Sequence, residues 1–183
     1  MNIIKMPIIN LVADASIDPL TLTEVKNFLR VDIITDDDLI TRIIKTAIKQ
    51  CELYTGKTLI TKTYKYSFYN SIIQAVKLLY APIQSISSVK VVNEENSETT
   101  INSSVYFIDT IGGILNFKTV PANFYRLDIT YIAGYGSNAT DVPEELKQAM
   151  LIHIARMYDD KNGYSILPKT SLDIYKKHKI VRF

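Results

Sequence analysis

The chain has 183 residues, of which 47% are hydrophobic and 22% charged, a composition typical of a folded soluble domain. Its net charge of +2 is too small to identify a nucleic-acid binder by itself. The single cysteine, Cys51, excludes an internal disulfide. No apolar run has the length of a membrane span, and Lys5 and Pro7 interrupt the apolar start as they would not in a signal peptide. We therefore expect a protein made in the cytoplasm, without membrane contact.

Two helices are predicted in the first third of the chain. Thr21 and Glu24 have the spacing of a capping box, which predicts a short helix that ends near Arg30. A longer helix is predicted from about Asp37 to Thr55, because its apolar residues recur at the spacing of one helix face. Gly56 follows at the position of a left-handed cap. The predicted buried stripe consists of Leu39, Ile40, Ile43, Ile44, Ala47, Ile48 and Cys51.

The pattern changes to short strands after this helix. Residues 58–69 are rich in Thr, Tyr, Ile and Phe, with Tyr64, Tyr66 and Phe68 on one face of an extended strand. Turn residues such as Asn93–Asn96 separate the later segments. Short strands joined by such turns predict an antiparallel sheet or small barrel. The further predicted strands are 77–80, 86–92, 105–108, 113–117 and 126–132.

A final long helix is predicted beyond the strands. Asp141 and Glu144 resemble a second capping box, and Pro143 fits an early helical position, where its missing N–H is not needed. The apolar stripe begins at Leu146 and the helix ends near Asp160. His153 lies within this stripe, so a packed, hydrogen-bonded core histidine is favoured over a metal ligand.

The remaining residues, 162–183, form a basic tail with weak patterning. From Lys169 onward it carries five Lys/Arg and one Asp. Such a tail is either a solvated, partly disordered end or an element that docks on an acidic partner or DNA. Its many apolar residues favour docking on a protein. The candidate partner-binding residues are Lys169, Tyr175, Lys176, Lys177, Lys179, Arg182 and Phe183.

Other residues with chemical potential have simpler structural interpretations. The aspartates at 36–38 suit a hard cation, but no calcium-binding loop follows, and acidic residues are favourable at a helix N-terminus. Cys51 lies on the buried stripe without a basic neighbour, which favours an inert thiol. Tyrosines interleaved with lysines can stack nucleic-acid bases, although strand and interface packing is favoured. We expect no enzymatic activity, no metal and no cofactor.

Several segments in order resemble one protein family. These are Leu20–Lys26, Asp36–Ile40, Tyr54–Lys57, Ala81–Val89, Tyr131–Gly136 and Val142–Ala149. Together they resemble the head–tail connector, or head-completion adaptor, family of long-tailed bacteriophages and prophages. The resemblance covers roughly residues 19–160, and the segments before Pro19 and after Tyr164 match no part of the family pattern.

The resemblance implies a structural virion protein at the head–tail interface, or neck. It implies a ring of about a dozen copies on the portal, which extends the DNA channel and offers a platform to the next head-completion or tail protein. Genomic DNA would pass through without sequence-specific contact. The alternative function is a small nucleic-acid-binding module that uses the Tyr/Lys-rich sheet and the basic tail.

The sequence thus predicts an α+β fold with one connector domain over residues 1–183. A helical core, made of the short, long and C-terminal helices, carries an antiparallel β-rich insertion. The predicted parts are a leader (1–18), helices (19–57), the insertion (58–136), a helix (140–161) and the basic tail (162–183). In this arrangement the sheet would form an outer or inter-subunit layer.

Overall fold

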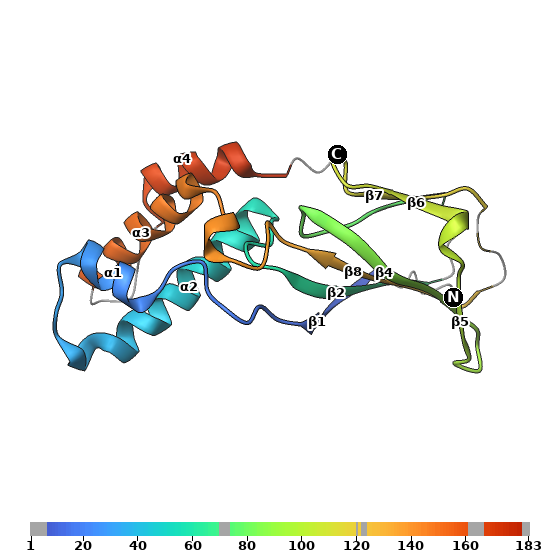
Figure 1. Ribbon diagram of the computed structural model, residues 1–183, viewed down its shortest axis with the longest axis horizontal. Helices are drawn as coiled ribbons and strands as arrows, with labels where there is room; N and C mark the ends of the chain where they lie inside the picture. The colour runs from blue at the N-terminus through green and yellow to red at the C-terminus, as the bar shows by residue number, and fades with distance from the viewer. Residues whose placement is uncertain (1–6, 70–73, 120, 122–123, 161–166, 181–183) are drawn as a thin grey trace, which may run out of the picture. The chain divides into compact units, whose positions relative to one another are not determined.

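The structure, a computed structural model, describes residues 7–69, 74–119, 121, 124–160 and 167–180 (Figure 1). The chain divides into two compact units. The sheet unit comprises Met1–Ala15 and Thr61–Gly134, and the helical unit comprises Ser16–Ile60 and Tyr135–Phe183. Among the described residues the α-helices all lie in the helical unit and the strands all lie in the sheet unit. The predicted α+β class is confirmed.

The first two helices match their predicted bounds. α1 spans Leu22–Leu29 and begins at the Thr21–Glu24 capping box, in which each side chain accepts a backbone N–H. α2 spans Asp37–Thr55 and ends at Gly56, whose φ of 71° is left-handed. A short 3-10 turn, η1 (Ile34–Asp36), precedes α2. These ends are predictable because caps satisfy backbone groups through neighbouring residues.

The three aspartates lie at the start of α2, and two of them also have side-chain partners on other helices. Asp36 occupies the N-cap position of α2, but its side chain makes no capping hydrogen bond and instead accepts one from the Tyr158 hydroxyl. Asp37 pairs with Lys26 of α1. Asp37 and Asp38 still lie in the first turn of α2, where negative charge is favourable. The acidic N-terminus predicted for α2 is therefore present, while the Asp36 carboxylate is bonded by Tyr158 rather than by the helix backbone.

The third helix, α3, spans Glu144–Asp159 and begins later than the predicted capping box. Asp141 pairs with Asn138, three residues earlier, in a separate 3-10 turn, η3 (Ala139–Asp141). Pro143 is the N-cap residue of α3 rather than a residue of its first turn. The prediction that Asp141 pairs with Glu144 is therefore wrong, since Asp141 closes the preceding turn.

The core of the helical unit lies where α2 and α3 pack together. Most of the predicted α2 stripe is buried, from Ile40 to Cys51, but Leu39 is 41% exposed and faces outward. His153 of α3 is fully buried, as predicted. Neither of its ring nitrogens has a hydrogen-bond partner among the described residues, so the predicted hydrogen bonding is wrong. Buried α3 partners include Leu146, Ala149, Met150 and Ile154.

The basic tail contains a fourth helix that the sequence did not predict. α4 spans Lys169–His178 and contacts both α2 and α3. A helix of this length is marginal in isolation. Tertiary contacts, described below, supply its stability.

The sheet unit contains two antiparallel sheets. The larger has the order β1-β2-β8-β4-β5 and the smaller the order β3-β7-β6. The larger sheet consists of β1 (Ile8–Ala13), β2 (Lys62–Tyr69), β8 (Arg126–Ala133), β4 (Ile83–Val92) and β5 (Glu98–Thr100). The smaller consists of β3 (Ala75–Lys77), β7 (Ile114–Phe117) and β6 (Tyr106–Asp109). A short 3-10 turn, η2 (Ser103–Val105), precedes β6. The predicted antiparallel arrangement is confirmed.

Two edge strands, β1 and β5, are absent from the predicted set of strands. β1 lies in the segment predicted as an unpatterned leader and pairs with β2, with Ile9 opposite Tyr66. β5 closes a hairpin with β4 through a turn at Asn93–Asn96, and Asn96 is left-handed, with a φ of 62°. Edge strands have few buried side chains, so their sequences lack the alternation that identifies inner strands.

Alternation along the inner strands divides the larger sheet into two faces. Tyr64 and Tyr66 of β2 and Leu127 and Ile129 of β8 are buried in one core with Leu115 and other residues of the smaller sheet. The intervening residues lie on the opposite face, because successive strand side chains alternate. They are largely polar.

No helix in the described part of the chain is long and apolar enough to span a membrane.

Candidate assembly interface

The basic helix α4 is held on the helical unit by one buried stripe. Tyr175 is fully buried, with its ring centroid 6.2 Å from that of Tyr54 on α2. The Ser171 hydroxyl donates to the Ala149 carbonyl of α3 at 2.9 Å. Beyond the helix, the Ile180 N–H donates to the Thr55 carbonyl at the end of α2, also at 2.9 Å. α4 is therefore an integral part of the helical unit.

The opposite side of α4 presents its cations to the outside. Lys169, Lys176 and Lys177 are exposed. Lys176 lies 3.4 Å from Asp173, and half-exposed surface pairs of this kind contribute little to stability. The end of the helix is positively charged, which suits the helix dipole. The arrangement leaves lysines available to an acidic partner.

Two further residues at the end of α4 contact the helices beneath. Lys179 is exposed, and its Nζ lies 5.2 Å from the centroid of the Tyr54 ring, a cation–π distance. The His178 ring lies 3.1 Å from a Glu145 oxygen of α3. These contacts orient the end of the helix.

The structure thus separates the predicted partner-binding residues into three groups. Lys169, Lys176, Lys177 and Lys179 are gathered on the exterior of α4 and just beyond it. Tyr175 is inside the helical unit and supports α4 from within. Arg182 and Phe183 lie outside the described residues. The basic cluster is thus brought together on one rigid element.

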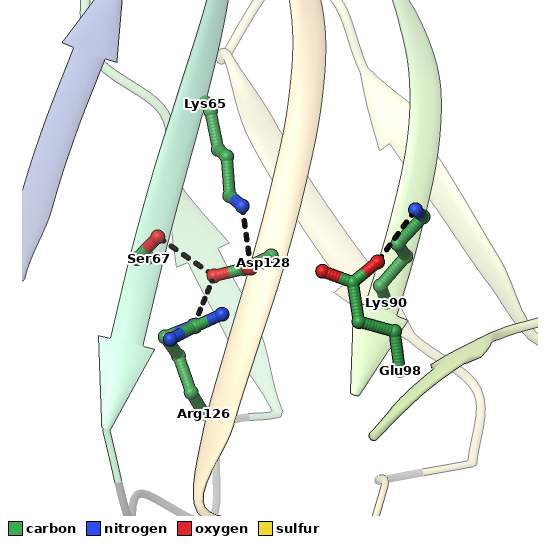
Figure 2. Close-up of polar contacts among 6 residues, drawn as sticks. All are labelled: Lys65, Ser67, Lys90, Glu98, Arg126 and Asp128. Carbon is green, nitrogen blue, oxygen red and sulfur yellow. Dashed lines mark hydrogen bonds and ion pairs between the residues drawn. The ribbon is translucent and has the colours of Figure 1, made fainter. Parts of the chain in front are cut away.

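A second charged cluster lies on the polar face of the larger sheet (Figure 2). Asp128 of β8 is only 2% exposed and accepts from the Ser67 hydroxyl at 2.7 Å and from Arg126 Nε at 2.9 Å. Lys65 Nζ lies 2.8 Å from its other oxygen. Burial alone would raise the pKa of Asp128, but bonds from Lys65, Ser67 and Arg126 outweigh it and lower the pKa.

A neighbouring pair extends this polar face toward β5. Lys90 Nζ lies 2.8 Å from a Glu98 carboxylate oxygen across the β4–β5 hairpin (Figure 2). The pair raises the pKa of Lys90 and lowers that of Glu98. The sequence prediction did not identify these charged residues. The alternation of Lys65 and Ser67 with the buried tyrosines of β2 is the sequence pattern that indicates this polar face.

Three tyrosines of the inner strands β2 and β8 face the core of the sheet unit rather than the exterior. Tyr64 stacks on Tyr80 at 4.8 Å and on Tyr131 at 5.8 Å between ring centroids. Tyr64, Tyr66 and Tyr131 are buried, so their faces are used within the core. The structure therefore gives no support to the alternative function of base stacking on the sheet.

Cys51, the single cysteine, is buried in the helical unit. Burial, with the neighbouring Glu52 carboxylate, raises the pKa of the Cys51 thiol to about 12, so the thiol stays protonated near neutral pH. Among the described residues, no group of three His, Cys, Asp or Glu side chains is arranged to hold a metal ion.

Comparison with known proteins gives a family and a fold. The family model described as "Head completion protein" matches residues 19–165. No curated protein sequence matches the chain.

Solved structures of gene transfer agent particles are similar to the chain along almost all of its length. The first comes from the neck of an empty particle computed with C6 symmetry, with a TM-score of 0.83 and 20% identity over 96% of this chain and 97% of that chain. The second comes from the virion of a native particle, with a TM-score of 0.82 and 19% identity over 96% of each chain. The third comes from the neck of a native particle computed with C12 symmetry, with a TM-score of 0.77 and 19% identity over 96% and 97%. At these identities the likeness establishes the shared fold.

Proposed function

We propose that this chain, which belongs to the head completion protein family, is a structural neck protein that joins a phage-type head to its tail. The observation that carries the proposal is the extent of the family match, which includes residues of both units. The fold likeness to neck chains also covers 96% of this chain. The whole chain, rather than one motif, therefore supports the assignment.

In this role the protein works by assembly rather than by catalysis. We propose that copies close into a ring on the portal, as the C6 and C12 symmetries of the similar necks suggest. A closed ring extends the channel through which DNA passes and offers a second surface to the next head-completion or tail protein. The location proposed for the assembled protein is the virion neck.

The exterior of α4 is the proposed portal-docking element. Its lysines are held outward by a helix anchored through Tyr175, Ser171 and Ile180. Charged side chains on a fixed element steer association with an oppositely charged surface. The proposed partner is therefore an acidic surface of the portal, while DNA in the channel is not recognised by sequence.

The test replaces Lys176→Glu and Lys177→Glu together in particles that carry the full chain. We expect rings to form while less of the protein cosediments with portal-bearing heads, and packaged DNA, measured by quantitative PCR, to leak. A matched control is Lys77→Glu with Lys118→Glu, since both lysines are exposed on the sheet unit and the charge change is equal. Unchanged portal binding and DNA retention in the α4 variant would contradict portal docking by this helix.

A further inference from the structure

The outward face of α2 is a basic stripe that the fold of one chain leaves uncovered. Arg42, Lys45 and Lys49 are exposed, and after Asp38 in the first turn no acidic residue occupies an exposed position of the helix. Lys45 is held by Asp18 at 2.8 Å. Within the described part of the chain the structure shows no acidic partner for Arg42 or Lys49, so the stripe retains its positive charge.

The same face of α2 also has apolar ends. Leu39 is 41% exposed and Leu53 is 60% exposed. Together with Thr46 they recur every seven residues, which places them on one line along the helix. The line is about 21 Å long at roughly 1.5 Å per residue. Leu39 and Leu53 therefore lie at the two ends of the charged face, with the cations between them.

The outward face of α3 has the opposite charge and the same length. Glu144, Glu145 and Asp159 are exposed, and Arg156 is the one exposed cation of this helix. Glu144 lies 2.5 Å from Lys147 and Glu145 lies 3.1 Å from His178. Glu145, Ile152 and Asp159 again recur every seven residues, a line of about 21 Å at roughly 1.5 Å per residue. Ile152, at its centre, is only half-buried. The exposed acidic residues of α3 thus have the opposite charge to the exposed cations of α2, Arg42, Lys45 and Lys49.

We infer that the basic face of α2 in one copy of this chain binds the acidic face of α3 in the next copy. The two helices pack on each other through their buried stripes, so their exposed faces are turned away from the shared core. One face cannot therefore reach the other within the same chain. A ring built head to tail needs two different complementary surfaces on each subunit, and these faces meet that requirement. The inference rests on the proposed ring.

The experiment reverses the charge on one face at a time in the full chain. Arg42→Glu with Lys49→Glu makes the α2 face acidic. Gln148→Lys with Asp159→Lys makes the α3 face basic and spares the contact of Glu145 with His178. Mass photometry across a concentration series at low salt gives the fraction of ring. We expect each variant to need a roughly tenfold higher concentration, or to form no rings, since like charges across an interface are unfavourable.

Restoration separates a broken interface from a broken fold. A chain with all four substitutions has both faces reversed, so its copies are complementary again and rings should return. Mixing the α2-face variant with the α3-face variant should also give rings in which the two alternate. The control is again Lys77→Glu with Lys118→Glu, for which rings should form as in the wild type.

The outcomes distinguish this interface from the proposed function. If both single-face variants form rings as readily as the wild type, the proposed interface is wrong and the proposed ring stands. The interface is also wrong if rings are lost and neither the four-substitution chain nor the mixture restores them. It is wrong too if rings are lost in the control variant but not in the face variants. A wild-type chain that stays monomeric at every concentration and on portal-bearing heads would instead overturn the proposed ring, and the interface with it.

Discussion

Among single residues, two buried polar side chains differ in whether they have hydrogen-bonding partners. Asp128 is surrounded by three donors and keeps its charge. His153 is as deeply buried, but its two ring nitrogens have no hydrogen-bond partner among the described residues. A buried polar group without a partner costs roughly 1–3 kcal/mol. His153 therefore reduces the stability of the helical core, whereas Asp128 holds β2 and β8 together.

Replacement of His153→Leu is expected to stabilise the protein, most of all in mild acid. Burial lowers the pKa of His153, so the folded chain keeps the ring neutral. The unfolded chain takes up a proton below about pH 6.5, and wild-type stability falls as pH drops below that value. Urea unfolding should show a gain of roughly 1–3 kcal/mol at about pH 8 and a larger gain at about pH 5.5.

The control for this prediction is His178→Leu. That ring is partly exposed and lies beside Glu145, so its removal relieves no buried polar group without a partner. A gain for His153→Leu that is equal at both pH values would show that the ring does not titrate on unfolding.

At the scale of elements, α4 shows how a weakly patterned segment becomes a helix. Its buried side chains, Ser171 and Tyr175, are separated by one helical turn. Their partners, Ala149 and Tyr54, are far away along the chain. Nothing within the ten residues of α4 identifies those partners. The helix exists because α2 and α3 provide a surface for it.

Replacement of Tyr175→Ala should therefore detach α4. Loss of a large buried aromatic side chain costs roughly 3–5 kcal/mol. Hydrogen exchange should increase in the backbone amides of residues 171–178, and chemical unfolding should show reduced stability of the helical unit. Lys177→Ala is the matched control on the exposed side, with an expected change within about 0.5 kcal/mol. Unchanged exchange in the Tyr175 variant would mean that other contacts hold α4.

At the scale of the whole molecule, the sheet unit is inserted into the helical unit at a point where the chain closes on itself. Ile60 and Gly136 form a parallel bridge, and the Tyr135 N–H donates to the Leu59 carbonyl at 3.2 Å. The two ends of the insertion therefore meet inside the helical unit. The helical core does not depend on the length of chain between them.

Excision of the sheet unit should leave a helical unit that folds. The chain would start at Ser16, and a short Gly/Ser linker would replace Thr61–Gly134, because insertions end where the flanking backbone is already joined. We expect a helical circular-dichroism spectrum and a cooperative thermal transition at reduced temperature. A control chain that lacks a segment of equal length, beginning within α2 after Ile48, should not fold. A non-cooperative transition in the excised chain would contradict an independent helical core.

Features that depend on near neighbours can be predicted from the amino-acid sequence alone. The capping box at Thr21, the left-handed cap at Gly56 and the stripe of α2 follow from contacts three or four residues apart. The segments that carry the family resemblance also lie at such caps, turns and strands. The family match confirms the resemblance.

Contacts between residues far apart in the sequence become visible only in the folded chain. Ser67 donates to Asp128 across 61 positions of the chain and Tyr158 to Asp36 across 122, and β1 and α4 form on surfaces built by other elements. Closing long loops depends on the sum of many burial and pairing energies, which no local pattern records. For the same reason, the outward charges of α2 and α3 became candidate contact surfaces only once their inner faces were known.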